Sequence, residues 1–166
     1  MSLEELNTLP RKRAEARFRD CCAADPWVQG MLDNRPFASR DAMIAQSRRV
    51  WPSLTENDWL QAFEAHPKIG NVDSLRRKYT STKGLASGEQ AGVRHAPEAV
   101  LQCLKTGNDA YQEKFGFIFI VYATGKSAEE MLELLASRLP NTREQEIDNA
   151  AREQAQITEI RLEKLA

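Results

Sequence analysis

The feature that most constrains the fold is the uninterrupted stretch that follows Pro140. Asn141 and Thr142 restart the chain as a helix, and neither glycine nor proline occurs after Pro140. A helix of about 23 residues fits this stretch, and it would be ~35 Å long at 1.5 Å per residue. The chain is therefore predicted to end in one long helix.

Capping motifs and prolines divide the rest of the chain into further helices. Ser2 with Glu5 and Ser127 with Glu130 have the spacing of capping boxes. Other helix starts are expected at Pro10, at Asp25-Pro26, at Ser39, at Thr55 and at Pro97. The apolar, β-branched and aromatic run at 117–122 could be a buried strand, but no partner strand is visible, so an extended or buried helical segment is favoured. The prediction is an all-α fold, a single-domain helical bundle over residues 1–166 with a long C-terminal helix.

Composition and charge narrow the classes of function. Lys and Arg number 23 against 24 Asp and Glu, and the net charge of -1 gives no electrostatic argument for nucleic acid or an anionic membrane. No apolar run approaches the roughly 20 residues of a membrane helix, and no N-terminal signal is visible. Cys21, Cys22 and Cys103 have the spacing of neither a disulfide framework nor a zinc site, so reduced thiols and a cytoplasmic location are expected.

His66 is the first candidate for chemistry. It lies in the sequence EAHPKIG, from Glu64 to Gly70, and the following Pro67 predicts that the preceding helix ends at His66 or just before it. A helix C-terminus stabilises an imidazolium, which favours a proton donor. A lone histidine near an apolar helix is more often structural, so both interpretations stay open.

Arg161 is the second candidate, because of its place on the last helix. A stripe at steps of three and four is formed by Ile147, Ala150, Gln154, Ile157, Arg161 and Leu165. Arg161 is therefore expected on the inward face. It is either a snorkelling or partner-paired arginine, or a buried guanidinium awaiting a carboxylate or another anion.

The third candidate is Glu89 with Gln90, between Gly88 and Gly92. A glutamate near a helix start usually complements the helix dipole, but the flanking glycines indicate a polar pocket lined by backbone. No metal, phosphate-loop or nucleophile-elbow motif is present, which disfavours metal, nucleotide and acyl-enzyme chemistry. From the residues alone, the prediction is a small-molecule site with one histidine, one glutamate and one arginine.

Together these motifs resemble a known family. The segments HPKIG at 66–70, EQAG at 89–92, KFGF at 114–117 and ATGKS at 123–127, followed by the long helix with Arg161, resemble the 2-oxo-4-hydroxy-4-carboxy-5-ureidoimidazoline (OHCU) decarboxylases. The resemblance covers nearly the whole chain in the right order. It implies an all-α, cofactor-free and typically homodimeric enzyme without a metal. Such an enzyme converts OHCU, which derives from urate, to (S)-allantoin and carbon dioxide.

The resemblance also implies roles for individual residues. His66 would be the catalytic acid with Pro67 beside the substrate, and Arg161 would hold the ring. Glu89 and Gln90 would bind the ring and help to protonate or orient it. Which of His66 and Glu89 delivers the final proton stays open. Further substrate contacts are implied for Ala86, Ser87, Gly88, Gln90, Phe117, Ile118, Phe119, Ile120 and Val121. Relatives commonly have serine where this chain has Ala86, and many have proline where it has Ile118.

Two other functions remain open at this point. One is a helical protein-interaction module in which the polar residues are incidental. The other is a different lyase or a hydrolase that acts on a related ureide.

Overall fold

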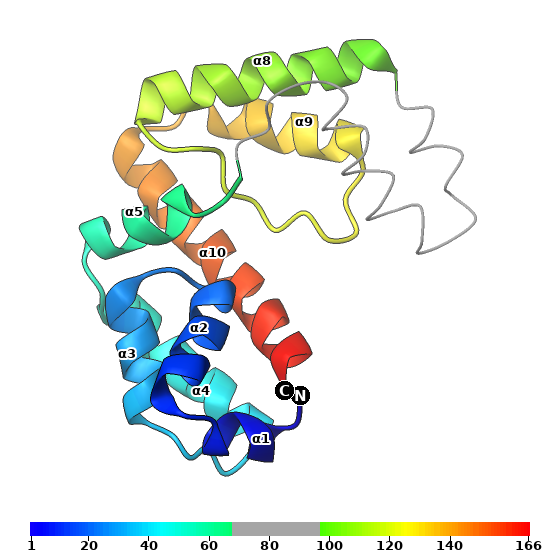
Figure 1. Ribbon diagram of the computed structural model, residues 1–166. Helices are drawn as coiled ribbons and strands as arrows, with labels where there is room; N and C mark the ends of the chain where they lie inside the picture. The colour runs from blue at the N-terminus through cyan, green and yellow to red at the C-terminus, as the bar shows by residue number, and fades with distance from the viewer. Residues whose placement is uncertain (68–96) are drawn as a thin grey trace. The chain divides into compact units, whose positions relative to one another are not determined.

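The computed structural model describes residues 1–67 and 97–166, and every regular element within these ranges is a helix (Figure 1). The predicted all-α class is therefore confirmed. The chain divides into two compact units, Met1–His66 with Ala151–Ala166, and Pro67–Ala150. Organisation as a single domain stays a prediction.

The first unit begins with short helices at the predicted starts. They are α1 (Leu3–Thr8), α2 (Arg11–Cys21), α3 (Asp25–Asp33), α4 (Arg40–Val50), the 3₁₀ turn η1 (Trp51–Ser53) and α5 (Glu56–Glu64). Ser2 and Glu5 form the predicted capping box of α1, and Thr55 and Asp58 form one at α5. The helix boundaries thus follow from local side-chain hydrogen bonds that satisfy the first backbone N–H groups.

Helix α3 lies at the centre of this unit and packs against α2, α4 and α5. Its Trp27 is fully buried, meets Phe18 edge to face with ring centroids 6.1 Å apart, and donates its indole N–H to Ser47 Oγ at 3.0 Å. Trp51 is also buried and donates its indole N–H to the carbonyl of Ala151 at 2.9 Å. Both indoles bury a large apolar area while keeping their polar N–H paired.

The second unit contains α8 (Glu98–Phe115), α9 (Ala128–Arg138) and the first turns of α10 (Arg143–Leu165). Figure 1 shows α8 and α9 lying side by side. Gly107 lies at their contact, where an added Cβ atom would lie 2.5 Å from Leu135 Cδ2 and would force that side chain to move. Helix α8 ends at Gly116, whose φ of 84° suits glycine.

Residues 117–123 link α8 to α9 without regular secondary structure, as expected for an extended segment. Phe117, Phe119 and Ile120 are buried, whereas Ile118 and Val121 are half-buried. The rings of Phe117 and Phe119 both meet Tyr111 edge to face. The aromatic run is therefore explained by core packing, with no need of a sheet.

A buried carboxylate organises this unit. Glu146 is completely buried and accepts hydrogen bonds from Tyr111 Oη at 2.6 Å and Arg138 Nε at 2.7 Å. Asn141 and Asn149 add bonds at 2.9 and 2.7 Å. Burial by itself raises the pKa of Glu146, but these four donors outweigh it and hold the pKa below the ordinary 4.5.

Arg138 connects this cluster to the irregular segment. Its Nη1 donates to the carbonyl of Ile120 at 2.7 Å, and its guanidinium lies 4.6 Å from the Phe119 ring centroid. The carboxylate thus orients the arginine, and the arginine fixes the backbone at residue 120. A charged pair inside the core determines where an irregular segment lies.

The long helix α10 covers Arg143–Leu165, 23 residues, as predicted. Its buried face differs in part from the expected stripe: Ile147, Ala150 and Gln154 are buried, but Ile157, Arg161 and Leu165 are only half-buried. Thr158 and Leu162 are buried in their place. A row at steps of four is inclined to the helix axis, so the buried face departs from the expected stripe toward the C-terminal end of the helix. The expectation that Arg161 lies within the inward face is corrected to a position at its margin.

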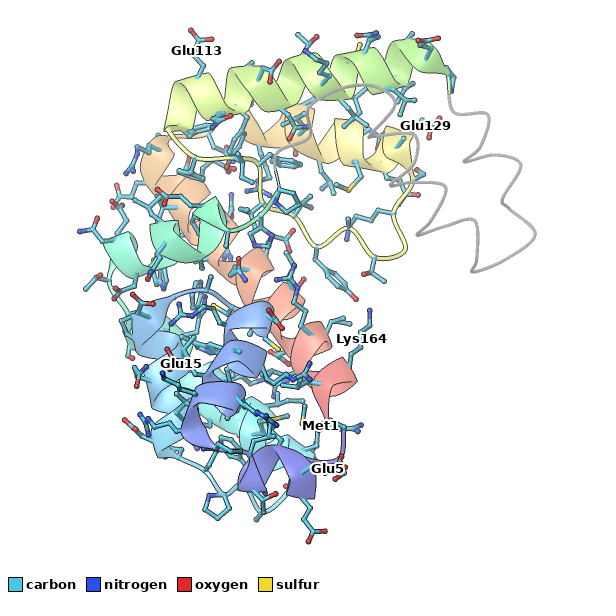
Figure 2. All side chains as sticks on the ribbon, viewed as in Figure 1. Met1, Glu5, Glu15, Glu113, Glu129 and Lys164 are labelled. Carbon is cyan, nitrogen blue, oxygen red and sulfur yellow. The ribbon has the colours of Figure 1, made fainter. Side chains whose placement is uncertain are left out.

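We predict that Glu146→Gln lowers the free energy of unfolding by about 3–5 kcal/mol, because the guanidinium of Arg138 then stays buried without its counter-charge. Urea denaturation followed by circular dichroism measures this. The matched control is Glu113→Gln, an exposed residue of α8 that points to solvent in Figure 2, where a change within about 0.5 kcal/mol is expected.

The pH dependence gives a second check on the same variant. Because the pKa of Glu146 is lowered on folding, its stabilisation is present above the unfolded pKa and is lost as the pH falls through the folded pKa. The difference between the wild-type protein and Glu146→Gln should therefore shrink on acidification. Equal stability of the two at neutral pH would contradict the proposed importance of the buried charge.

Candidate functional site

His66 and Arg161, two of the predicted site residues, line one pocket of the first unit. Its volume is about 270 Å³. The lining residues come from α2, the turn after it, the end of α5 and the C-terminal half of α10: Arg19, Asp20, Cys22, Ala23, Ala62, Ala65, His66, Gln154 and Arg161. Residues distant in the sequence thus converge on one polar cavity.

His66 lies just beyond the end of α5, as Pro67 predicts. Its backbone N–H donates to the carbonyl of Phe63 at 3.1 Å, which closes the last turn. Its side chain is half-buried, and Nε2 lies 2.5 Å from Oε1 of Gln154. The imidazole is therefore held from one side by a buried amide of α10.

Two guanidinium groups line the pocket, and their surroundings differ. Arg19 pairs with Asp25 at 2.7 Å and with Glu15 at 3.3 Å, and these carboxylates raise its pKa. Arg161 donates to the backbone carbonyl of Cys21 at 3.4 Å, and no carboxylate of the described residues forms an ion pair with it. Arg161 is thus the guanidinium whose charge is available to an anionic ligand.

The neighbouring thiols are unsuited to nucleophilic catalysis. Burial raises the pKa of Cys21 to about 12 and that of Cys22 to about 11, although the nearby Arg161 lowers both. A thiol with such a pKa is protonated at neutral pH and is a poor nucleophile. All three cysteines of the chain are free, and Cys103 is exposed.

The other predicted site residues lie elsewhere or outside the described residues. Pro67 is exposed directly after His66. The segment 117–121 belongs to the second unit, where the carbonyl of Ile120 accepts from Arg138. The predicted contacts at Ala86, Ser87, Gly88, Glu89 and Gln90 lie outside the described residues.

Gln154 is the pocket residue that the sequence analysis placed on a helix face without assigning it to the site. It is 1% exposed, and its Nε2 donates to Thr158 Oγ1 at 3.1 Å. The available signal was a glutamine within a stripe of mainly apolar residues. Such a residue predicts a buried hydrogen-bonding partner, but spacing alone cannot name it.

No cluster of three or more His, Cys, Asp or Glu side chains within residues 1–67 and 97–166 has the geometry of a metal site. In the same part of the chain, no helix combines the length and the apolar character that a membrane span needs.

Comparison with known proteins shows which family this chain resembles in sequence. The family model of the OHCU decarboxylases matches residues 7–163. A uric acid degradation bifunctional protein of Arabidopsis thaliana is 36% identical over 91% of the chain, which spans 47% of that longer protein. The 2-oxo-4-hydroxy-4-carboxy-5-ureidoimidazoline decarboxylase of Halalkalicoccus jeotgali is 26% identical over 99% of this chain and 92% of its own.

Solved structures agree with this. A crystal structure of OHCU decarboxylase in the presence of (S)-allantoin superposes with a TM-score of 0.71, is 34% identical, and is matched over 89% of this chain and 95% of its own. A crystal structure of (S)-allantoin synthase, 16% identical, has the same fold with a TM-score of 0.74.

The structure thus defines an all-α protein with a polar pocket that holds a histidine and a guanidinium. The chain belongs to the OHCU decarboxylase family. The predicted family and its class, a carboxy-lyase of urate degradation, are confirmed.

We predict that Arg161→Lys raises KM about tenfold, because an ammonium cannot replace the two parallel N–H bonds of a guanidinium to a carboxylate. Steady-state kinetics on OHCU measure the effect. The matched control is Arg152→Lys, an exposed arginine of α10 that does not line the pocket, and it should leave KM unchanged. Unchanged KM and kcat in Arg161→Lys would favour a structural role for Arg161.

Proposed function

We propose that the chain catalyses the cofactor-free decarboxylation of OHCU to (S)-allantoin and carbon dioxide. The observation that carries the proposal is that His66 and Arg161 line the same pocket. This pocket offers a proton-exchanging imidazole and a guanidinium without a carboxylate partner among the described residues, which suits an anionic substrate that must be protonated. The named activities of the relatives support the same reaction.

The proposed reaction requires few chemical groups from the protein. The bond between the ring carbon and the carboxylate breaks and carbon dioxide leaves, while the electron pair spreads into the conjugated ring of the substrate. One proton then forms the new C–H bond on one face of that carbon. Because the substrate accepts its own electron pair, pyridoxal or thiamine is not required as an electron sink.

The protein must hold the substrate and deliver the proton to one face. Arg161 is proposed to bind the substrate through its guanidinium, and its fixed charge would stabilise the negative charge that develops. His66, with Glu89 and Gln90 contributing from residues outside the described ranges, is proposed to orient the ring and to supply the proton. Pro67 and the backbone of 117–121 complete the proposed contacts, together with Ala86, Ser87 and Gly88.

The decisive experiment is stereochemical. OHCU is generated in situ and the appearance of (S)-allantoin is followed by circular dichroism, against the racemic product of spontaneous decay. We predict that the wild-type chain yields the S enantiomer and that His66→Ala and Glu89→Ala each lower kcat by about 10²–10⁴-fold, as expected for loss of a general acid.

His95→Ala, at the only other histidine, is the matched control and should keep wild-type turnover. Helical circular dichroism of each variant confirms that it is folded. Racemic product from the wild-type chain would refute the proposed function, and near-normal turnover of both His66→Ala and Glu89→Ala would refute the proposed site. Parallel assays on allantoin and hydroxyisourate separate the chain from other ureide enzymes.

We also propose that the chain is a homodimer, as the family resemblance implies. Sedimentation equilibrium over a range of protein concentrations should give twice the chain mass of 18.8 kDa. A single species at the chain mass across that range would contradict this proposal.

A cytoplasmic location is proposed on the basis of the thiols. All three cysteines are free, as expected in a reducing compartment. Fractionation of the source cells tests this, and the chain is expected in the cytoplasmic fraction. Finding it in another fraction would contradict the proposed location.

A further inference from the structure

Gln154 has a buried side chain whose two polar ends are both engaged. The residue is 1% exposed, and the neighbouring Thr158 is 2% exposed. Its amide oxygen lies 2.5 Å from His66 Nε2, and its amide nitrogen donates to Thr158 Oγ1 at 3.1 Å. A buried amide that lost either partner would keep an unsatisfied polar atom, so both contacts are energetically important.

The hydrogen-bond pattern fixes the orientation of this amide. The hydroxyl oxygen of Thr158 accepts the hydrogen bond from the amide nitrogen of Gln154. An amide nitrogen only donates, so this contact points the nitrogen of Gln154 toward Thr158. The amide oxygen of Gln154 therefore faces His66, and an oxygen that only accepts requires a hydrogen on Nε2 of the imidazole.

We propose that Gln154 is the positioning residue of His66: it holds the Nε2–H form, so that the proton exchanged during turnover is the one on Nδ1. When one ring nitrogen of a neutral histidine donates, the other is the site that gains and loses the proton. The catalytic part of this statement rests on the proposed function. The tautomer assignment is argued from the contact between Gln154 and His66 and can be tested without substrate.

Several charged or titratable side chains lie in the same pocket as the imidazole. The charged or titratable groups that line the same pocket are Arg19 and Asp20 of α2, Cys22 after that helix, and Arg161 of α10. Glu64 is the acidic residue at the end of α5 itself, and it is exposed. Gln154 contributes no charge to this set, so it orients the ring without stabilising the imidazolium by a counter-charge.

Three substitutions separate positioning from simple packing. Gln154→Leu keeps most of the volume and removes the acceptor, Gln154→Glu keeps an acceptor and adds a negative charge, and Thr158→Val removes the hydroxyl that orients the amide. The matched control is Gln156→Leu, an exposed glutamine two residues along the same helix. Helical circular dichroism verifies folding for each variant.

The first measurement needs no substrate. Nitrogen-15 NMR of the imidazoles in the full chain, with His66→Gln to assign the signals, reports which ring nitrogen carries the proton. We expect neutral His66 to be the Nε2–H form in the wild type and in Gln156→Leu, and a mixture of both tautomers in Gln154→Leu. An Nδ1–H form in the wild type, or an unchanged tautomer balance in Gln154→Leu, would overturn the assignment whatever the substrate is.

The second measurement is the pH dependence of kcat on OHCU. Gln154→Leu should lower kcat about 10- to 100-fold with little change in KM, because a misaligned proton donor slows the chemical step. Gln154→Glu should recover part of kcat with its pH profile moved to higher pH, because a carboxylate stabilises the imidazolium. If Gln154 only filled space, Gln154→Glu would be at least as damaging as Gln154→Leu and the profile would not move, which would overturn the proposal.

Discussion

The requirement that buried polar groups be paired shapes both units of this protein through helix α10. Glu146, Gln154 and Thr158 are buried polar residues of that helix. In the second unit Glu146 gathers Tyr111 and Arg138 around its carboxylate. In the first unit Gln154 joins His66 to Thr158. An apolar helix face would pack against almost any neighbour, whereas these residues accept only partners with matching donors and acceptors.

The hydrogen-bond networks around Glu146 and Gln154 have different roles. The one around Glu146 carries charge and fixes backbone, since Arg138 reaches from the carboxylate to the carbonyl of Ile120. The one around Gln154 is neutral and fixes the orientation of an imidazole. A neutral network suits a site that must exchange protons, because it holds the ring in place without adding a charge that would favour one protonation state.

Local signals in the sequence predicted the helices well, because a capping box depends on residues three apart. Ser2 and Glu5 form the predicted capping box, and α5 begins after Thr55 as expected. At the predicted Ser127–Glu130 pair, the Ser127 hydroxyl accepts from the backbone N–H of Glu130. The pairing of His66 with Arg161 in one pocket followed from family resemblance and partly from the helical stripe. The stripe placed Arg161 on the inward face, whereas the residue is only half-buried, because periodicity does not reveal which inclined row of the helix is covered. The Gln154 contact could not be predicted, because it joins two helices whose packing is a tertiary property. The expected roles of Glu89 and Gln90 stay predictions.

The protonation of the buried thiols has a practical consequence for labelling. Cys21 and Cys22 are buried with pKa values near 12 and 11, whereas Cys103 is exposed on α8. A maleimide fluorophore or spin label would therefore attach at one position of the native chain without prior removal of cysteines. A covalent inhibitor aimed at the thiol of Cys22, although that residue lines the pocket, would find no thiolate to attack.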